Sequence, residues 1–301
     1  MTKARDTANI IKQPFTQTLG TSNYRAGVNA GNSIASGGNN NTVVGDEAGT
    51  ALTTGDDNVA IGFEALKTED EHGRNVAVGY QSLKTLNAGA LAVTTTVGYK
   101  SGTSLTTGVQ NTLIGGLAGD ALTDADYNVA VGNNTLSTDT QGSKSTAIGY
   151  EALATQNFTS ATDAHNTAVG HQAGASITTG VQNTLIGSLA GDALTTGSLL
   201  AVGYLAGSAA TTSVGNVLVG ELAGTALTTG QHNTAVGSQA LSTEDEHGLN
   251  VAIGHDALRN LNAGVDGNNT AVGYNAGQAL TTGVQNTIVG SVAGDAFTDA
   301  D

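Results

Sequence analysis

The sequence has no cysteine and no tryptophan, and its 301 residues include one proline and one methionine. Without cysteine there is no disulfide framework, no thiol chemistry and no cysteine-ligated zinc site. Aromatic residues make up 4% and charged residues 12% of the chain. A globular core of this length normally relies on bulky Leu, Phe, Met and Trp side chains. Here the apolar residues are mostly Ala, Val, Leu and Ile, so any core must be thin and repetitive.

Positive charge is also scarce, since 10 Lys and Arg residues accompany 25 Asp and Glu residues and the net charge is −15. Nucleic acids and anionic membranes both require clusters of Lys or Arg, so we expect neither as a partner. No stretch approaches the roughly 20 apolar residues of a membrane helix. The segment from Met1 to Asp6 is not followed by the apolar run of a secretory signal. We therefore predict no membrane insertion and no cleaved leader.

Glycine is abundant, with 43 residues, and it marks a repeat. The repeated word has five residues and ends in glycine, as in Asn-Thr-Val-Val-Gly at 41–45 and Asn-Val-Ala-Ile-Gly at 58–62. Ten of the fourteen spacings between successive words are 17 residues, and Val or Ile precedes the glycine every time. This regularity indicates a repeat protein. The glycines that end the words are Gly45, Gly62, Gly79, Gly98, Gly115, Gly132, Gly149, Gly170, Gly187, Gly203, Gly220, Gly237, Gly254, Gly273 and Gly290.

The word predicts a short strand, because two β-branched residues two positions apart share one face of a strand. Stacked strands predict an all-β parallel β-solenoid of about 15–16 coils, each of about 17 residues. We expect the Val and Ile positions to form an internal ladder, the Ala or Leu between them to point outward, and each glycine to make a sharp bend with an unusual φ. A second short strand is expected in the other half of each unit. The predicted ladder includes Val44, Ile61, Val78, Ile114, Val131, Val169, Ile186, Val236, Ile253 and Val272.

The repeat also predicts the domain organisation. Residues 22–37 hold a worn copy of the unit, so we place the solenoid at 22–301 and a separate leader at 1–21. A longer repeat of 175 residues, ten coils, brings the Thr-Glu-Asp-Glu-His-Gly loop of 68–73 back at 243–248. In that register Asp301 corresponds to Asp126, after which another coil begins, so we expect the natural chain to continue beyond Asp301. Insertions at 86–89 and 155–165 are expected to share one edge of the rod.

The words at 58–62 and at 166–173 (Asn-Thr-Ala-Val-Gly-His-Gln-Ala) resemble the head repeats of trimeric autotransporter adhesins, the YadA-like head. The resemblance covers nearly all of residues 22–301. It implies a left-handed parallel β-roll and a homotrimer with small residues at the subunit interface. The usual period of 17 is longer than the typical unit of that family, so the turns must differ. The chain also lacks the export signal, coiled-coil stalk and membrane anchor of the family.

The first ten residues, Met1 to Ile10, instead resemble the openings of tail-fibre proteins from bacteriophages of aquatic bacteria. Together the two resemblances favour a homotrimeric phage tail fibre that mediates host attachment and is located in the virion. Residues 1–21 would then bind phage tail or adaptor proteins, and the fibre would bind a host cell-surface receptor, with a glycan as one candidate. The alternative is a trimeric adhesin head on the bacterial cell surface. An exposed apolar stripe along one sheet would also favour closed trimer symmetry.

Signatures of catalysis are missing from the sequence. There is no Gly-x-Ser-x-Gly, Walker loop or His-Glu-x-x-His motif, and no pair of carboxylates is singled out as an acid and a base. We therefore expect no enzyme activity, no cofactor and no metal. The loops at 68–73 and 243–248 have the residue types to hold a cation, but a metal site needs several converging ligands and a solvated polar turn is the favoured interpretation.

Two other columns of residues allow a structural and a binding interpretation. The Asn that opens most words is interpreted as a stacked turn residue rather than as a ligand-binding ladder. Tyrosines directly after the word glycine are suited to stacking on sugars, although packing beside the bend is favoured. An ice-binding surface would need a Thr-x-Thr array on every coil, and Thr-Thr-Gly is absent from about half of them. These tyrosines are Tyr80, Tyr99, Tyr150, Tyr204 and Tyr274.

Overall fold

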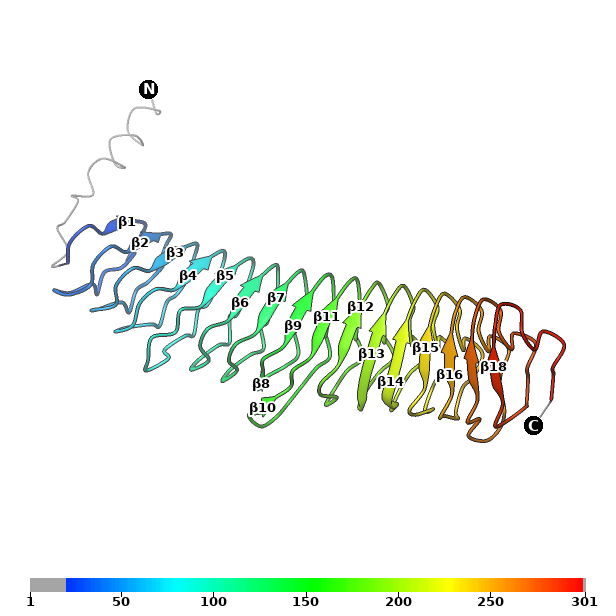
Figure 1. Cartoon of the computed structure of the whole chain (residues 1–301). Coiled ribbons are helices and arrows are strands. Elements are labelled where there is room, and N and C mark those ends of the chain that lie inside the picture. Colours follow the sequence, from blue (N-terminus) through cyan, green and yellow to red (C-terminus); the bar gives the residue numbers. More distant parts are fainter. Residues whose placement is uncertain (1–19, 300–301) are drawn as a thin grey trace, which may run out of the picture.

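A computed structural model describes residues 20–299, and these residues form a rod of β-strands and turns without an α-helix. Sixteen parallel strands lie in one sheet, in chain order along the rod apart from the separate pair β8 and β10 (Figure 1). The protein is therefore the parallel β-solenoid that the repeat predicts. Residues 1–19 of the predicted leader, and the end of the chain at Asp301, lie outside the described residues.

Most strands are three residues long, because each coil contributes only the centre of its repeated word. Each residue pairs with the residue at the same word position in the next coil, as Thr42 does with Val59. The strands of the main sheet are β1 (Tyr24–Ala26), β2 (Thr42–Val44), β3 (Val59–Ile61), β4 (Val76–Val78), β5 (Thr95–Val97), β6 (Thr112–Ile114), β7 (Val129–Val131), β9 (Thr146–Ile148), β11 (Thr167–Val169), β12 (Thr184–Ile186), β13 (Ser198–Val202), β14 (Val214–Val219), β15 (Thr234–Val236), β16 (Val251–Ile253), β17 (Thr270–Val272) and β18 (Thr287–Val289).

The ends and edges of the rod follow the sequence closely. The worn copy predicted at 22–37 carries β1, which pairs with β2, and its Ala30 and Ile34 lie in the core. The insertion at 155–165 carries β10 (Thr162–Asp163), which pairs with β8 (Gly142–Ser143) of the preceding coil. Figure 1 shows β8 and β10 together along the lower edge of the rod, away from the main sheet.

The orientation of the strands differs from the prediction. The middle residue of each word, such as Ala60 or Leu113, is fully buried, whereas the Val or Ile before the glycine is partly exposed. The prediction of an internal Val and Ile ladder is therefore wrong: those residues do form a ladder, but it lies outside. A strand of three residues points one side chain to one face and two to the other. The narrow interior, already filled from the opposite wall by turn residues such as Leu52, has room for the single one.

The second half of each coil consists of turns, so the predicted second strand is also wrong apart from the short pair β8 and β10. Residues such as Glu47 and Gly49 have φ values of 59° and 51°, and such left-handed positions break the pleat of a strand. Hydrogen bonds between coils persist nevertheless. The N–H of Gly49 donates to the carbonyl of Ala65 in the next coil over 2.9 Å, and the N–H of Thr53 donates to that of Asp70 over 2.7 Å.

The coils are of two types, which differ in the fourth residue after the word glycine. Gly-type coils have glycine there, and Leu-type coils have leucine, in both cases usually with a left-handed φ. The Gly-type positions are Gly31, Gly49, Gly102, Gly119, Gly174, Gly191, Gly207, Gly224, Gly277 and Gly294. The Leu-type positions are Leu66, Leu83, Leu136, Leu153, Leu241 and Leu258, all with positive φ and all fully buried.

Candidate functional site

The outer face of the main sheet is a continuous uncharged surface. It consists of the first and third residues of the word centre in β2 to β7, β9 and β11 to β18, and we call it the outer sheet face. Every one of these positions carries Thr, Val, Ile or Leu, although the chain as a whole has a net charge of −15. The predicted ladder residues Val44, Ile61, Val78, Ile114, Val131, Val169, Ile186, Val236, Ile253 and Val272 all lie on this face.

The outer sheet face is only partly covered within one chain. Ile61 is 37% exposed and Ile186 is 39% exposed. Fifteen strands at about 4.8 Å spacing extend the face for roughly 70 Å. Scattered exposed aliphatic residues are ordinary on a protein surface, but a contiguous apolar patch usually marks an interface. The predicted apolar stripe therefore exists, but it is made of Val, Ile and Thr, because the Ala and Leu residues assigned to it are inside.

The word glycines stack in a column beside this face. Gly115 has a φ of 137°, which residues with a side chain rarely adopt. A Cβ atom on Gly115 would overlap the carbonyl oxygen of Gly132 in the next coil. The bend thus needs glycine for its φ and for the close approach of successive coils, and the predicted unusual φ is confirmed.

The word asparagines form a buried column inside the rod. The Oδ1 atom of Asn41 accepts the N–H of Asn58 in the next coil over 2.9 Å. Its Nδ2 atom donates to the carbonyl of Gly55 over 2.8 Å. Because both residues are fully buried, the turn interpretation is confirmed and a solvent-facing ligand ladder is ruled out at these positions.

Several of the aromatic residues after the word glycine stack on a ring of the neighbouring coil. The ring centroids of Phe63 and Tyr80 are 5.5 Å apart, and so are those of Tyr80 and Tyr99, with interplanar angles of 17° and 12°. Tyr150 stacks on His171 in the same way. Stacked neighbours cover both faces of the Tyr80 ring, which leaves its edge to solvent. A sugar stacks on a ring face, so this geometry favours the packing interpretation.

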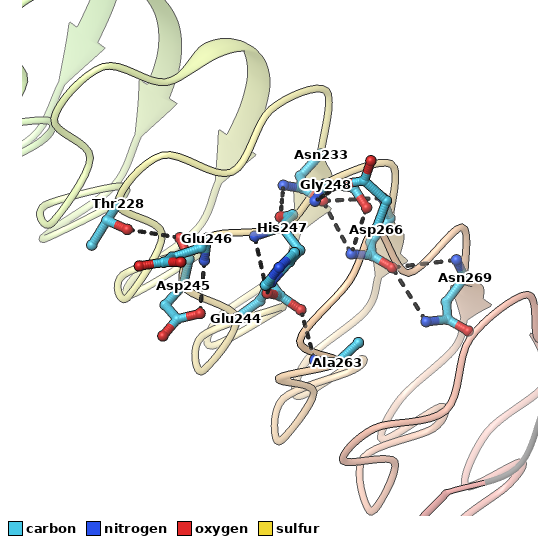
Figure 2. A network of polar contacts seen from close by, with 11 residues as sticks. Thr228, Asn233, Glu244, Asp245, Glu246, His247, Gly248, Ala263, Asp266 and Asn269 are labelled. Atoms are coloured by element: carbon cyan, nitrogen blue, oxygen red, sulfur yellow. Dashed lines mark hydrogen bonds and ion pairs between the residues drawn. The ribbon is translucent and has the colours of Figure 1, made fainter.

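The two copies of the Thr-Glu-Asp-Glu-His-Gly loop contain the most unusual polar groups of the rod. Glu69 and Glu244 are fully buried, so the interpretation of these loops as solvated turns is wrong for both carboxylates. Each lies three residues after the leucine of a Leu-type coil. The carboxylate of Glu244 accepts the N–H of His247 over 3.3 Å and that of Ala263 over 3.4 Å (Figure 2). It therefore holds its own turn against the loop of the next coil.

The first loop repeats this geometry. The carboxylate of Glu69 accepts the N–H of His72 over 3.1 Å and that of Ala88 over 3.5 Å. Burial raises the pKa of Glu69 and that of Glu244 above the usual carboxyl value, and the backbone N–H groups offset part of that rise. Both carboxylates therefore carry a desolvation cost that a nearby cation would reduce.

A histidine nitrogen faces each buried carboxylate. The Nδ1 atom of His72 is 3.4 Å from Oε1 of Glu69, and that of His247 is 3.5 Å from Oε1 of Glu244. These pairs would attract as ions only with a protonated histidine, and both distances are longer than a typical hydrogen bond of about 2.9–3.0 Å. Both Nδ1 atoms are buried without a hydrogen-bond partner among residues 20–299. Each loop thus holds an unsatisfied nitrogen beside a buried oxygen.

A shallow surface pocket adjoins each loop. The pocket beside the second loop has a volume of about 300 Å³ and is lined by residues that include His232, Glu246 and Asp266. The pocket beside the first loop has about 230 Å³ and includes His72 and Arg74 in its lining. Solvent and small ions therefore have access close to both loops.

Comparisons with family models, with curated proteins and with solved structures found no match to this chain. In the part of the chain that the structure describes, no helix has the length and hydropathy needed to cross a bilayer. Its function must therefore be inferred from the rod itself, its uncharged sheet face and its two buried carboxylate loops.

Proposed function

We propose that this protein is a structural, adhesive component of a phage virion, a homotrimeric tail fibre that attaches the particle to its bacterial host. The observation that carries the proposal is the outer sheet face, an uncharged apolar surface along the full sheet of a rigid rod. A surface of this kind is suited to lateral association with copies of the same chain. It supplies a shaft rather than a catalytic pocket.

The size of the proposed interface follows from the repeat. Each coil adds one more pair of Thr, Val, Ile or Leu side chains to the contact, so the interface grows with the length of the rod. Closed cyclic symmetry covers such a face completely and leaves no copy with an exposed stripe. The resemblance of the words to YadA-like heads favours three copies. The contact residues in this proposal are β-branched apart from Leu200, and they replace the small residues that the resemblance implies.

The virion location rests on the resemblance of residues 1–10 to phage tail-fibre openings. In this proposal residues 1–21 join the fibre to tail or adaptor proteins, and the assembled fibre contacts a host surface receptor. The alternative is a trimeric adhesin head on the bacterial surface, which the same word resemblance supports. Both require the same lateral trimer, so the oligomeric state and the location are tested separately.

Solution mass tests the trimer. One chain is 29.7 kDa, and three chains therefore give about 89 kDa. We expect the wild-type protein at the trimer mass in sedimentation equilibrium and the Ile114→Glu/Ile186→Glu variant at the monomer mass. Val265→Glu is the matched control, since Val265 is 55% exposed but lies in a loop rather than on the outer sheet face. A stable wild-type monomer with native β-sheet circular dichroism would rule the trimer out.

Electron microscopy with antibodies against this chain tests the location. We expect labelled fibres on the tails of purified virions. Labelling of the envelope of uninfected bacteria, with unlabelled virions, would instead establish the adhesin alternative.

A further inference from the structure

Each of the two Glu-His loops gathers three groups that could hold a metal ion. One ligand atom each from Glu69, Asp70 and His72 lie within 4.8 Å of one another, and Glu244, Asp245 and His247 repeat the group. Two ligands with bonds of about 2.0–2.2 Å to a tetrahedral ion are roughly 3.3–3.6 Å apart. The distances of 3.4 Å and 3.5 Å between histidine Nδ1 and glutamate Oε1 match that separation. A hydrogen bond from nitrogen to oxygen is typically about 2.9–3.0 Å.

The unsatisfied histidine nitrogen is an independent sign of a missing partner. The side chains of His72 and His247 are 27% and 26% exposed, yet their Nδ1 atoms are buried and have no hydrogen-bond partner among the described residues. A buried polar atom without a hydrogen-bond partner carries a desolvation penalty that nothing offsets. The same atom is unsatisfied in both loops, ten coils apart, and a metal ion bound through the neutral imidazole would satisfy it in each.

The carboxylate ligands are already held in place. Glu244 is fixed by backbone N–H groups from its own turn and from Ala263 of the next coil, as Figure 2 shows. Asp245 accepts the N–H of Glu246 over 2.7 Å, and Asp70 accepts that of Glu71 over the same distance. Hydrogen bonds of this kind orient the ligands of a metal and reduce the entropy that binding would cost.

We propose that each loop binds one divalent transition-metal ion, with Zn²⁺ as the reference ion. The ligands are His72 Nδ1 with the carboxylates of Glu69 and Asp70 in the first loop. In the second loop they are His247 Nδ1 with those of Glu244 and Asp245. Imidazole together with carboxylates suits Zn²⁺ and its neighbours in the first row, whereas Ca²⁺ prefers six to eight oxygens. Three protein ligands leave a fourth position for water. The bound ion would fix the loop in its turn and neutralise the buried charge.

Metal binding to the full-length protein, made without a histidine tag and stripped with a chelator, tests the proposal. Isothermal titration with Zn²⁺, together with elemental analysis after desalting, should give two ions per chain for the wild type. His72→Gln should retain one ion and His72→Gln/His247→Gln none, with unchanged β-sheet circular dichroism. His171→Gln is the control, because His171 is an exposed histidine that stacks on Tyr150, and it should keep two ions.

Glu244→Gln provides a second variant, which keeps one acceptor oxygen for the N–H of His247 and loses the oxygen that accepts the N–H of Ala263. We expect it to retain only the ion of the first loop. Zn²⁺ should raise the melting temperature of the wild type and leave that of the double histidine variant unchanged. A stripped wild type that binds no Zn²⁺ overturns the proposal, and so does a double variant that binds as many ions as the wild type. Binding of Ca²⁺ in place of Zn²⁺ at these loops would overturn the assignment to a transition metal.

Discussion

Two neighbouring coils of the rod fill the interior in different ways. One has a large side chain in the strand and glycine after the bend, and the other has alanine in the strand and leucine after the bend. In the Gly-type coil of Gly119, the large side chains are Leu113 in the strand and Leu122 in the turn, and both are fully buried. A Cβ atom on Gly119 would lie 2.8 Å from Leu122 Cδ1 and 3.0 Å from Leu113 Cδ2. The next coil is Leu-type: Leu136 takes the glycine position and the strand contributes only Ala130.

The exchange holds in one direction along the rod. All six Leu-type coils have Ala in the middle of the strand, whereas Gly-type coils have either a larger residue there, such as Val43 or Leu113, or Ala as well, as at Ala168, Ala201 and Ala271. The Leu-type strand residues are Ala60, Ala77, Ala130, Ala147, Ala235 and Ala252. Protein interiors are close-packed, so added volume on one wall must be removed from the other. Where a Gly-type coil also has Ala in its strand, side chains of the neighbouring coils lie beside the glycine, as Leu153 and Leu185 do at Gly174.

The difference also decides where polar groups are buried. Three residues after the Gly or Leu that defines the coil type, the Gly-type coils among residues 20–299 have only Ala, Leu, Ile or Phe. Four Leu-type coils have a polar residue there instead, namely Glu69, Asp139, Gln156 and Glu244, and all four are fully buried. Asp139 accepts the N–H groups of Gly142 and Phe158 over 3.0 Å each. Leu-type coils thus supply the acceptors that hold the loop edge together, and Gly-type coils supply a purely aliphatic wall.

The largest expected loss of stability comes from placing glutamate, which is buried in two Leu-type coils, at the same position of a Gly-type coil. Leu194 lies in an aliphatic column between Ile177 and Ala210. Leu194→Glu should lower the free energy of unfolding by about 4 kcal/mol, because it buries a carboxylate without a prepared partner. Urea unfolding followed by circular dichroism measures the loss. Leu194→Met is the control and should cost less than about 1.5 kcal/mol. Similar stabilities for the two variants would contradict the distinction between the coil types.

Overfilling a Leu-type coil is the next largest effect. Ala130→Leu should cost about 3 kcal/mol, because the new side chain competes with Leu136 for the same space. Adding Leu136→Gly recreates the arrangement of Leu113 and Gly119 and should recover much of the loss. A double-mutant cycle in urea measures this coupling, which we expect to be at least about 1 kcal/mol. Additive effects of the two substitutions would show that the walls do not compensate each other.

A smaller loss of stability is expected when the buried acid of a Leu-type coil is replaced by leucine, the residue that most Gly-type coils have at that position. Glu69→Leu should cost about 2 kcal/mol in the presence of a chelator, since the N–H groups of His72 and Ala88 lose their acceptor. Glu69→Gln keeps one of the two acceptor oxygens and should lose less stability than Glu69→Leu. Thermal unfolding measures both, and amide hydrogen exchange should show faster exchange confined to the loop edge in Glu69→Leu. Equal losses in the two variants would mean that the carboxylate fills space rather than holding the turn.

The smallest expected effect is a pH dependence of the free energy of unfolding, which arises from an ion cluster on the outer surface of the Leu-type coil of Leu66. Hydrogen bonds from Lys67, Lys84 and Gln81 lower the pKa of Glu64 from 4.5 to about 2. Because the folded state favours the ionised form, this stabilisation is complete above pH 4.5 and is lost as the pH falls toward 2. The loss should be about 1 kcal/mol, because both lysines are partly exposed and screened by solvent.

Unfolding of the Glu64→Gln variant across that pH window checks the assignment. The variant should lack this part of the acid-induced loss, and added salt should reduce it in the wild type. Glu221→Gln, which removes one exposed carboxylate elsewhere, serves as the control and should follow the wild type. An identical pH profile for Glu64→Gln and the wild type would show that the cluster does not stabilise the fold.

Much of the architecture could be predicted from the order of residues. The 17-residue spacing, the bend at Gly115 and the asparagine column that includes Asn41 all rest on local backbone rules, and each has the predicted role. The face to which Val44 points could not be predicted in the same way. A period of two shows which side chains share a face, and it does not show which face is covered. The sequence did contain a signal for the buried face. Leucine follows the bend only where the middle residue of the strand is alanine, as with Leu66 and Ala60, and this correlation indicates that the two positions share the interior.

The candidate metal loops show the same limit. Their residue types marked 68–73 and 243–248 as possible cation ligands in the sequence, but a run of acids is ordinarily solvated. Burial of Glu69 results from its place three residues after Leu66, on the inner wall of the coil. The orphaned nitrogen of His72 follows from that burial and is visible only in three dimensions.

The sequence by itself determined that this chain is a parallel solenoid with glycine bends and an asparagine column, because each of these depends on a repeated local pattern. Only the tertiary structure decided which residues are inside. Stacking the coils brings the turn residues of each unit opposite its strand, and the limited volume between them admits one strand side chain. This limit on volume places the Val and Ile ladder outside, on the outer sheet face, and it places Glu69 and Glu244 inside.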